Sequence, residues 1–470
     1  MSRYPKTLSF SGPNAPVRIE CDIPDLDFDG EIPPDLAGAF YRVQPDPQLP
    51  PRQPDDILFN GDGMVTQFRF RNGRVDLRQR WCQTDKWKLE REAGRALFGA
   101  YRNPLTDDPS VSGRHRGTAN TNVVFHGGLL FALKEDSPAL AMNAETLETL
   151  GYHDFEGQVT SPTFTAHPKI DPRTGDLCAF GYAAKGVFTR DVVYYEIGSD
   201  GTKKREVWFE VPDYCMMHDF GVTKDYAVFH LVPITGSWER LRQGLPHFGF
   251  DSRKDVHLAV LPRDGSARDL RLFTAPNCFA SHVMNAFNDG TRIYFDTPQA
   301  EGNMFPFFPD VEGAPFNPAK AVSRLTRWSV DMDSPSGDFG EREVLSDFVG
   351  EFPRMDERYA TEHYRHGWML GFPKGPGSQS SLAHIDLQSG KSSVWSTGTE
   401  TRVLQEPCFI PRSSRSPEGD GYIAQIQAHS DDGLSELLLF DALRVAEGPI
   451  ATIHLPLRMR FGFHGNWVPA

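Results

Sequence analysis

The chain has 470 residues, which is too long for one ordinary domain, yet no stretch of it has the composition of a linker. It carries 49 Lys and Arg against 63 Asp and Glu, and the net charge of −14 argues against binding to nucleic acid or to an anionic membrane surface. Hydrophobic residues make up 39% of the chain and charged residues 24%, which is typical of a soluble globular protein.

The N-terminal segment MSRYPKTLSFSGPNAP lacks the unbroken apolar region of a signal peptide. No later stretch approaches the roughly 18 apolar residues of a membrane span. We therefore expect a cytoplasmic protein without stable membrane insertion. The six cysteines form no CxxC pair, so we expect buried, reduced thiols at Cys21, Cys82, Cys178, Cys215, Cys278 and Cys408.

In chain order, the first predicted element is an amphipathic helix over residues 86–101 (KWKLEREAGRALFGAY). Five β-hairpins follow, each with an Asp-Gly, Ser-Gly or Gly-Gly turn. These hairpins begin at Asn122, Val192, Val256, Ala383 and Gly421. Two aromatic and proline-rich segments, 237–250 and 302–318, are expected to be long loops.

This pattern of many short strands predicts an all-β fold. A chain of this length must protect its sheet edges, and a β-propeller does so by closing a ring of four-stranded blades of about 40–50 residues each. We therefore predict one β-propeller domain over residues 1–470, with long loops on one face. No blade signature recurs at a fixed period.

Four histidines share an environment, since each lies in a small or apolar patch beside a predicted strand end: His167, His218, His282 and His464. They are separated by about one blade, one blade and at least three blades, so a closed ring could bring them together on its axis. Neutral imidazoles bind iron, copper, zinc or nickel, and four of them leave positions open on an octahedral metal. The alternative is four unrelated core histidines.

Ligating imidazoles usually donate their second N–H to a carboxylate. Three glutamates fit this role because they occur in apolar or proline-bound contexts: Glu135, Glu351 and Glu406. The alternative is three solvated acids beside turns.

Eight segments together resemble the carotenoid cleavage oxygenase family: FNGDGMV, ALKEDSPAL, AHPK, MHDFGVT, SHVMNAF, GEFPRMDERY, LQEPCFIPR and FGFHGNWV. They span nearly the whole chain in family order. The resemblance implies a seven-bladed β-propeller with a few short helices capping the active-site face. It also implies a non-haem Fe(II) held by His167, His218, His282 and His464. The implied carboxylate pairs are Glu135 with His218, Glu351 with His282, and Glu406 with His464.

Within that family the chain resembles the bacterial lignostilbene-α,β-dioxygenases, through Phe59, Tyr101 and Lys134. The resemblance implies that Phe59 stacks on a stilbene, while Tyr101 and Lys134 contact its 4-hydroxyl and act in catalysis. If strand alternation holds, Lys134 and Glu135 face opposite sides unless a bulge intervenes. A core Phe, a helix-end Tyr and a solvated Lys are the alternatives.

The implied activity, part of lignin-derived aromatic catabolism, is Fe(II)- and O₂-dependent cleavage of the central C=C bond of a 4-hydroxystilbene into two aromatic aldehydes such as vanillin. Within the family, an apocarotenoid or a phenylpropene such as isoeugenol are alternative substrates. The absence of a markedly apolar, membrane-dipping patch counts against a long carotenoid. From another class, a propeller hydrolase or binding scaffold without iron is the alternative. The sequence leaves the oligomeric state open, and a homodimer is one expectation.

Overall fold

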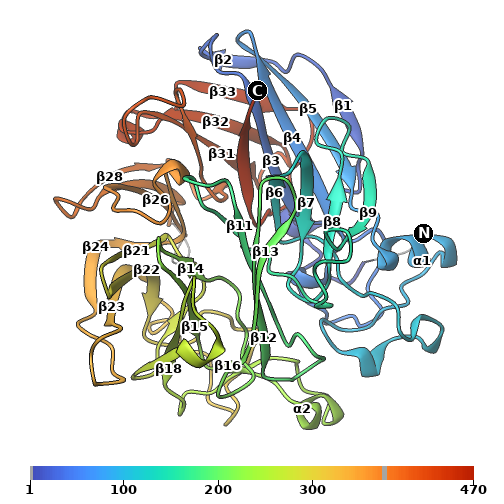
Figure 1. Ribbon diagram of the computed structural model, residues 1–470. Helices are drawn as coiled ribbons and strands as arrows, with labels where there is room; N and C mark the ends of the chain where they lie inside the picture. Colours follow the sequence, from blue (N-terminus) through green and yellow to red (C-terminus); the bar gives the residue numbers. More distant parts are fainter. Residues whose placement is uncertain (1–3, 373–377) are drawn as a thin grey trace. The chain divides into compact units, whose positions relative to one another are not determined.

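The computed structural model describes residues 4–372 and 378–470, and short antiparallel strands dominate it (Figure 1). The described residues contain two α-helices, α1 (Asp85–Ala93) and α2 (Trp238–Arg242), together with short 3₁₀ turns. Seven of the sheets have four or more strands, which is the blade count of a seven-bladed β-propeller. The predicted all-β class is therefore confirmed.

Helix α1 is shorter than the sequence pattern predicts. It begins after Thr84, whose side chain accepts a hydrogen bond from the N–H of Trp87, and it ends at Gly94, which adopts φ +66°. A glycine in the left-handed region terminates a helix at little cost, so the apolar residues after it continue as a loop. The prediction of a helix up to residue 101 was wrong, and Tyr101 lies in that loop.

The described chain divides into two compact units. The first unit comprises Met1–Glu156, Phe372–Ala383 and Ser393–Ala470, and the second comprises Gly157–Gly371 and His384–Ser392. The prediction of a single domain over residues 1–470 stays a prediction.

Three sheets belong to the first unit. One contains, in spatial order, β1 (Cys21–Ile23), β5 (Arg74–Trp81), β4 (Gly63–Arg71), β3 (Gly38–Pro45) and β34 (Gly465–Pro469). A second contains β6 (Asn122–His126), β7 (Leu129–Leu133), β8 (Ala139–Met142) and β9 (Thr149–His153). The third contains β2 (Phe28–Gly30), β33 (Ala451–Leu455), β32 (Ser435–Asp441), β31 (Gly421–His429) and β29 (Arg402–Leu404), with β30 (Cys408–Pro411) also paired to β31.

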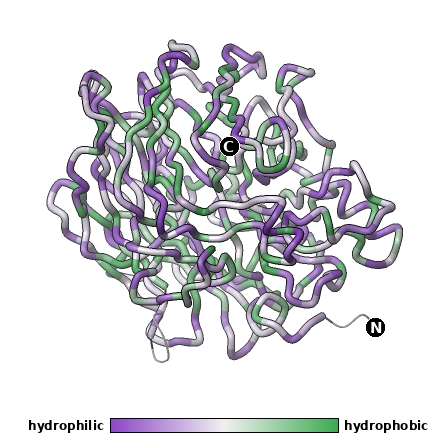
Figure 2. The backbone as a smooth tube through the Cα atoms, turned by 90° about the horizontal axis from the view of Figure 1, so that it is seen from below, coloured by the Kyte–Doolittle hydropathy of each residue, from purple (hydrophilic) through white to green (hydrophobic). Residues whose placement is uncertain are grey.

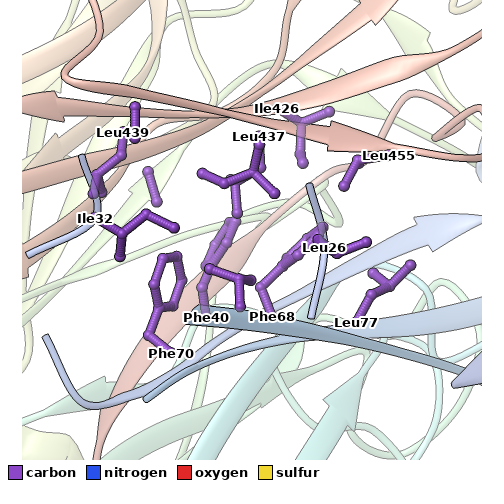
Figure 3. Close-up of a cluster of buried hydrophobic side chains, with 14 of the residues drawn as sticks. Leu26, Ile32, Phe40, Phe68, Phe70, Leu77, Ile426, Leu437, Leu439 and Leu455 are labelled. Carbon is purple, nitrogen blue, oxygen red and sulfur yellow. The ribbon is translucent and has the colours of Figure 1, made fainter. Parts of the chain in front are cut away.

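The first sheet combines strands from both ends of the sequence, because β34 pairs with β3 in antiparallel register from Gly38 opposite Pro469 to Arg42 opposite Gly465. A buried apolar cluster packs this sheet against the sheet of β29–β33 (Figure 3). Phe68 and Phe70 alternate with arginines along β4, and Leu437 and Leu439, two residues apart on β32, share one face of that strand. The C-terminal segment is thereby fixed in place immediately after His464.

Three larger sheets and one two-stranded sheet lie in the second unit. The first larger sheet contains β10 (Lys169–Ile170), β11 (Leu177–Tyr182), β12 (Asp191–Ile197) and β13 (Lys203–Glu210). The second contains β14 (Gly221–Val222), β15 (Tyr226–Leu231), β18 (Val256–Pro262) and β19 (Arg271–Ala275). The third contains β20 (Phe279–Ala280), β22 (Arg292–Ala300), β23 (Arg324–Asp331) and β24 (Glu343–Val349), with β21 (Asn285–Asp289) paired to β22. The small sheet pairs β16 (Ile234–Thr235) with β17 (Gly249–Phe250).

The remaining sheet contains β25 (Glu351–Met355), β26 (His366–Gly371), β27 (Ser381–Asp386) and β28 (Lys391–Ser396). All five predicted hairpins are confirmed, as β6–β7, β12–β13, β18–β19, β27–β28 and β31–β32. Along the chain, short hydrophobic segments are interleaved with hydrophilic ones, as expected for strands with a buried face (Figure 2).

Within the described ranges, no helix is both long and apolar enough to cross a membrane. The six cysteines are free thiols, as predicted, although Cys21 is half-buried rather than buried. Burial raises the pKa of Cys215 to about 12, so its thiol is unreactive near neutral pH.

Candidate metal centre

Three of the predicted histidine ligands meet in the second unit. His167, His218 and His282 lie in the irregular segments that flank β10, β14 and β20–β21, which places each side chain beside a strand end rather than within a ladder. The Nε2 atom of His218 lies 3.2 Å from Nε2 of His167 and 3.1 Å from Nε2 of His282. Their candidate ligand atoms all lie within 4.8 Å of one another. The structure thus brings these three residues together, and their role as metal ligands stays a prediction.

Glu351 fixes the orientation of His282. The Nδ1 atom of His282 lies 2.7 Å from Oε2 of Glu351, and the hydroxyl of Ser281 donates to Oε1 at 2.6 Å. Burial opposes ionisation of Glu351, but its contacts with His282, Ser281 and the N–H of Phe352 outweigh this and lower its pKa. The ionised carboxylate accepts a hydrogen bond from the Nδ1–H group of His282. The unprotonated Nε2 atom therefore directs its lone pair toward the other two imidazoles.

A bulge in β25 produces this geometry. The register between β25 and β26 shifts between Glu351 and Arg354, and Phe352 adopts φ +52°, which is unusual for a bulky residue. The N–H of Phe352 donates to the Glu351 carboxylate, and the Phe352 ring stacks on His282 with 5.1 Å between centroids. The strained residue thus turns the carboxylate toward Nδ1 while its ring supports the imidazole.

His464 has the same arrangement in the first unit. Its Nδ1 atom lies 2.7 Å from Oε1 of Glu406, whose Oε2 accepts the N–H of Gly465 at 3.0 Å. Both side chains are buried. The backbone of His464 is held on both sides, because its N–H donates to the carbonyl of Thr121 and its carbonyl accepts from Val43. The predicted pairs Glu351–His282 and Glu406–His464 are therefore present.

The three facing nitrogens suit a cation. With the proton of His282 on Nδ1, its Nε2 lone pair points at Nε2 of His218 from 3.1 Å, and only a proton or a metal ion between the rings makes that approach favourable. Imidazole nitrogens bind divalent first-row transition metals, iron among them. The donor set therefore fits the predicted Fe(II).

An aromatic and cationic cluster lies beside His464 in the first unit. Phe463 contacts the ring of Phe59 edge-on at 5.3 Å between centroids, and Phe59 contacts Tyr101 at 6.0 Å. The ammonium of Lys134 lies 5.0 Å from the centre of the Tyr101 ring. The three predicted substrate residues are thus neighbours, and Phe463 connects them to His464, a candidate ligand.

Lys134 is a buried cation with only 4% of its surface exposed. It lies just beyond β7 in the turn before β8, as does Glu135, so strand alternation does not govern their directions. Burial lowers the pKa of Lys134, and Arg102 lowers it further, whereas Glu135 and Asp136 oppose the change.

Arg102 engages both acidic residues that follow Lys134. Its guanidinium contacts Oε2 of Glu135 at 2.9 Å and Oδ2 of Asp136 at 3.2 Å. Among the described residues, no carboxylate oxygen lies within salt-bridge distance of the Lys134 ammonium. That ammonium is consequently placed over the ring of Tyr101, and the carboxylates of Glu135 and Asp136 act on it only from beyond salt-bridge distance. The predicted pairing of Glu135 with His218, a residue of the second unit, stays a prediction.

Sequence reasoning missed the residues that hold the aromatic segments. The buried carboxylate of Asp56 accepts the N–H of Tyr101 at 3.0 Å and also binds the amide of Asn60, next to Phe59. The Asn120 side chain donates to the carbonyl of Phe59 at 2.9 Å. The only signal for this network was the polar motif FNGDG itself, which does not reveal its partners.

A sequence model of the family described as RPE65, retinal pigment epithelial membrane protein, matches residues 14–469. The chain belongs to the RPE65/carotenoid oxygenase family. It is 52% identical to lignostilbene-α,β-dioxygenase isozyme III of Sphingomonas paucimobilis, covering 100% of this chain and 99% of the relative. It is 43% identical to isoeugenol monooxygenase of Pseudomonas nitroreducens, covering 97% of this chain and 96% of the relative.

Structural comparison agrees with this family assignment. The crystal structure of Pseudomonas brassicacearum lignostilbene dioxygenase superposes with a TM-score of 0.96 at 44% identity, over 100% of both chains. The seven-bladed β-propeller of the carotenoid oxygenase family, expected from the resemblance of the motifs, is thereby confirmed as the fold.

Proposed function

We propose that the protein is an Fe(II)-dependent dioxygenase that cleaves the central C=C bond of a 4-hydroxystilbene. The observation that carries this proposal is the buried ammonium of Lys134, which lies over the ring of Tyr101, while that ring in turn contacts Phe59. A cluster of this composition suits a flat aromatic substrate that carries an acidic hydroxyl. The 52% identity to a lignostilbene dioxygenase over the whole chain supports the same substrate class.

In this proposal, His167, His218, His282 and His464 hold the iron. Glu351 and Glu406 orient His282 and His464 from distances of 2.7 Å each, and Glu135 orients His218. Iron bound by four neutral imidazoles keeps open positions and supplies the binding and activation of O₂. The protein's own part is to hold each imidazole with Nε2 inward.

The phenol is bound by Lys134 and Tyr101. A buried ammonium close to the phenol stabilises the phenolate electrostatically and so lowers the pKa of the substrate hydroxyl. The phenolate pushes electron density through the ring to the alkene, which makes the alkene carbon more reactive toward oxygen. Phe59 stacks on the substrate ring and Tyr101 donates a hydrogen bond to its oxygen.

The overall reaction balances without a further reductant. One alkene and one O₂ give two aldehydes, with one oxygen atom in each product, and the four electrons that O₂ takes up come from the C=C bond. The only partners required are therefore the phenolic substrate and O₂. A cytoplasmic location and a homodimer belong to the same proposal.

A phenylpropene such as isoeugenol is the second candidate substrate, because a relative named isoeugenol monooxygenase is 43% identical over 97% of the chain. Such a compound carries a phenolic hydroxyl that Lys134 could bind in the same way as that of a 4-hydroxystilbene. An apocarotenoid offers this cationic cluster no acidic group, which disfavours it. Family membership also argues against the hydrolase and the scaffold.

One experiment tests the proposal. Purified protein loaded with Fe(II) is offered 4-hydroxystilbenes, isoeugenol and an apocarotenoid under air, and aldehydes are quantified for each. We expect the highest kcat/KM with a 4-hydroxystilbene and two aldehydes per O₂ consumed. Equal turnover of iron-free protein, or preference for the apocarotenoid, would contradict the proposal, and preference for isoeugenol would select the second candidate.

A further inference from the structure

One buried carboxylate connects the three histidine-bearing segments of the second unit. Asp219 follows His218 directly and is 2% exposed. Its Oδ2 accepts the N–H of Val283 at 2.8 Å, and its Oδ1 accepts the N–H of Phe220 at 2.7 Å. The ammonium of Lys169 lies 2.7 Å from the same Oδ1.

Each partner of Asp219 is adjacent to a metal-ligand candidate. Val283 follows His282, and Lys169 lies two residues after His167 at the start of β10. Residues 281–283 and 214–220 lie outside the strand ladders, and neighbouring strands hold them only at single points, such as the hydroxyl of Thr297 on the carbonyl of His282 at 2.7 Å. The backbone there is held by hydrogen bonds such as those to Asp219.

An ionised carboxylate is the only side chain of this size that can accept from all three donors. An asparagine has one acceptor oxygen and would turn its amide N–H₂ group toward either the Val283 N–H or the Lys169 ammonium. Both arrangements place a donor against a donor in a buried site, where an unsatisfied group costs more than in water.

We propose that Asp219 is a positioning residue for the metal centre: it sets the spacing of His167, His218 and His282 by binding the backbone or side chain next to each. It touches neither substrate nor metal. This role rests on the proposed metal-binding function. It assigns to the metal centre a residue that does not itself supply a ligand atom. Loss of such outer contacts typically lowers metal affinity about 10- to 100-fold.

The test is Co(II) binding to the metal-free full-length protein, measured by competition with a chelator and by the visible spectrum of bound Co(II). The variants are Asp219→Asn and, as a matched control, Glu90→Gln. Glu90 has the same kinds of partner in the first unit, namely the Lys86 ammonium at 3.0 Å and two backbone N–H groups at 2.9 Å. It is 1% exposed and adjoins none of the four histidines.

We expect Asp219→Asn to weaken Co(II) binding about 10- to 100-fold and to alter the Co(II) spectrum, with the KM for hydroxystilbene unchanged in the fraction that holds iron. Glu90→Gln should bind Co(II) within twofold of wild type with an unaltered spectrum. Equal binding by folded Asp219→Asn and wild type, or equal losses in both variants, would overturn the role of Asp219.

A second variant decides the matter if Asp219→Asn does not fold. Lys169→Met removes one partner at a partly exposed position and should weaken Co(II) binding at least about threefold, and an unchanged affinity would refute the proposal. A wild-type protein that binds neither Co(II) nor Fe(II) would refute the proposed function as well. Normal wild-type binding with unaffected variants would refute only the inference about Asp219.

Discussion

Replacing Lys134 with Met should remove phenol recognition while preserving the metal centre. Methionine keeps a long, flexible side chain of similar volume and deletes only the charge. Lys134 is 4% exposed, and its ammonium lies 5.0 Å from the centre of the Tyr101 ring, so few water molecules can take the place of the charge. The variant therefore leaves the substrate oxygen without its cationic partner.

The expected loss follows from the burial of this contact. A hydrogen bond to a charged group contributes about 1.5–3 kcal/mol, which corresponds to about 10- to 150-fold in rate. The phenolate would also lack a counter-charge in a site of low dielectric, which favours the upper end of this range. We expect kcat/KM for a 4-hydroxystilbene to fall about 100-fold or more, with iron content unchanged.

The assay compares Lys134→Met with wild type on matched 4-hydroxy and 4-methoxy stilbenes, with iron measured in each sample. Lys185→Met is the control variant, since Lys185 also lies over an aromatic ring, 5.6 Å from that of Trp208, but is mostly exposed. It should retain wild-type activity. Comparable cleavage of the two substrates by wild type, or full activity of Lys134→Met on the phenol, would refute phenol activation.

Three further outcomes are expected. Glu351→Gln and Glu406→Gln should each lower iron affinity or activity about 10- to 100-fold, as measured by metal titration, and wild-type values would show that these carboxylates do not orient the ligands. Asp56→Ala should raise the KM for hydroxystilbene more than it lowers kcat, because it frees the Tyr101 and Phe59 segments, and an unchanged KM would contradict this. Lys134→Met should also unfold at a higher temperature near pH 7. Burial lowers the pKa of Lys134 in the folded state, so the unfolded state binds more protons below the ordinary pKa of about 10.4, and each unit of lowering costs about 1.4 kcal/mol of folding free energy at neutral pH. The advantage of the variant should shrink as the pH rises toward 10, and calorimetry that finds it less stable at pH 7 would contradict the reasoning.

The sequence by itself determined the class of fold and the histidines that are the candidate metal ligands. Alternating apolar residues and tight glycine turns predicted the hairpins, such as the one after Asn122, where Gly127 and Gly128 both adopt positive φ. The histidines were recognisable because an imidazole in a small, apolar patch at a strand end is unusual. These signals are local, so they can be read along the chain.

Helix α1 shows where local signals fail. Its amphipathic pattern continues beyond Gly94, but the left-handed conformation of that glycine ends the helix, and Glu90 accepts the N–H groups of Leu97 and Phe98 in the loop that follows. The position of Tyr101 beside Phe59 depends on this loop and on Asp56, which precedes Tyr101 by 45 residues.

Tertiary structure decided which partners the charged groups have. Glu135 and Asp136 adjoin Lys134 in sequence, yet both bind Arg102, which leaves the ammonium to face an aromatic ring. Asp219 likewise connects segments that are 64 residues apart. Hydrogen bonds and ion pairs act over a few ångströms in space, whereas sequence patterns record only neighbours along the chain, so the selection of partners becomes visible only in the folded protein.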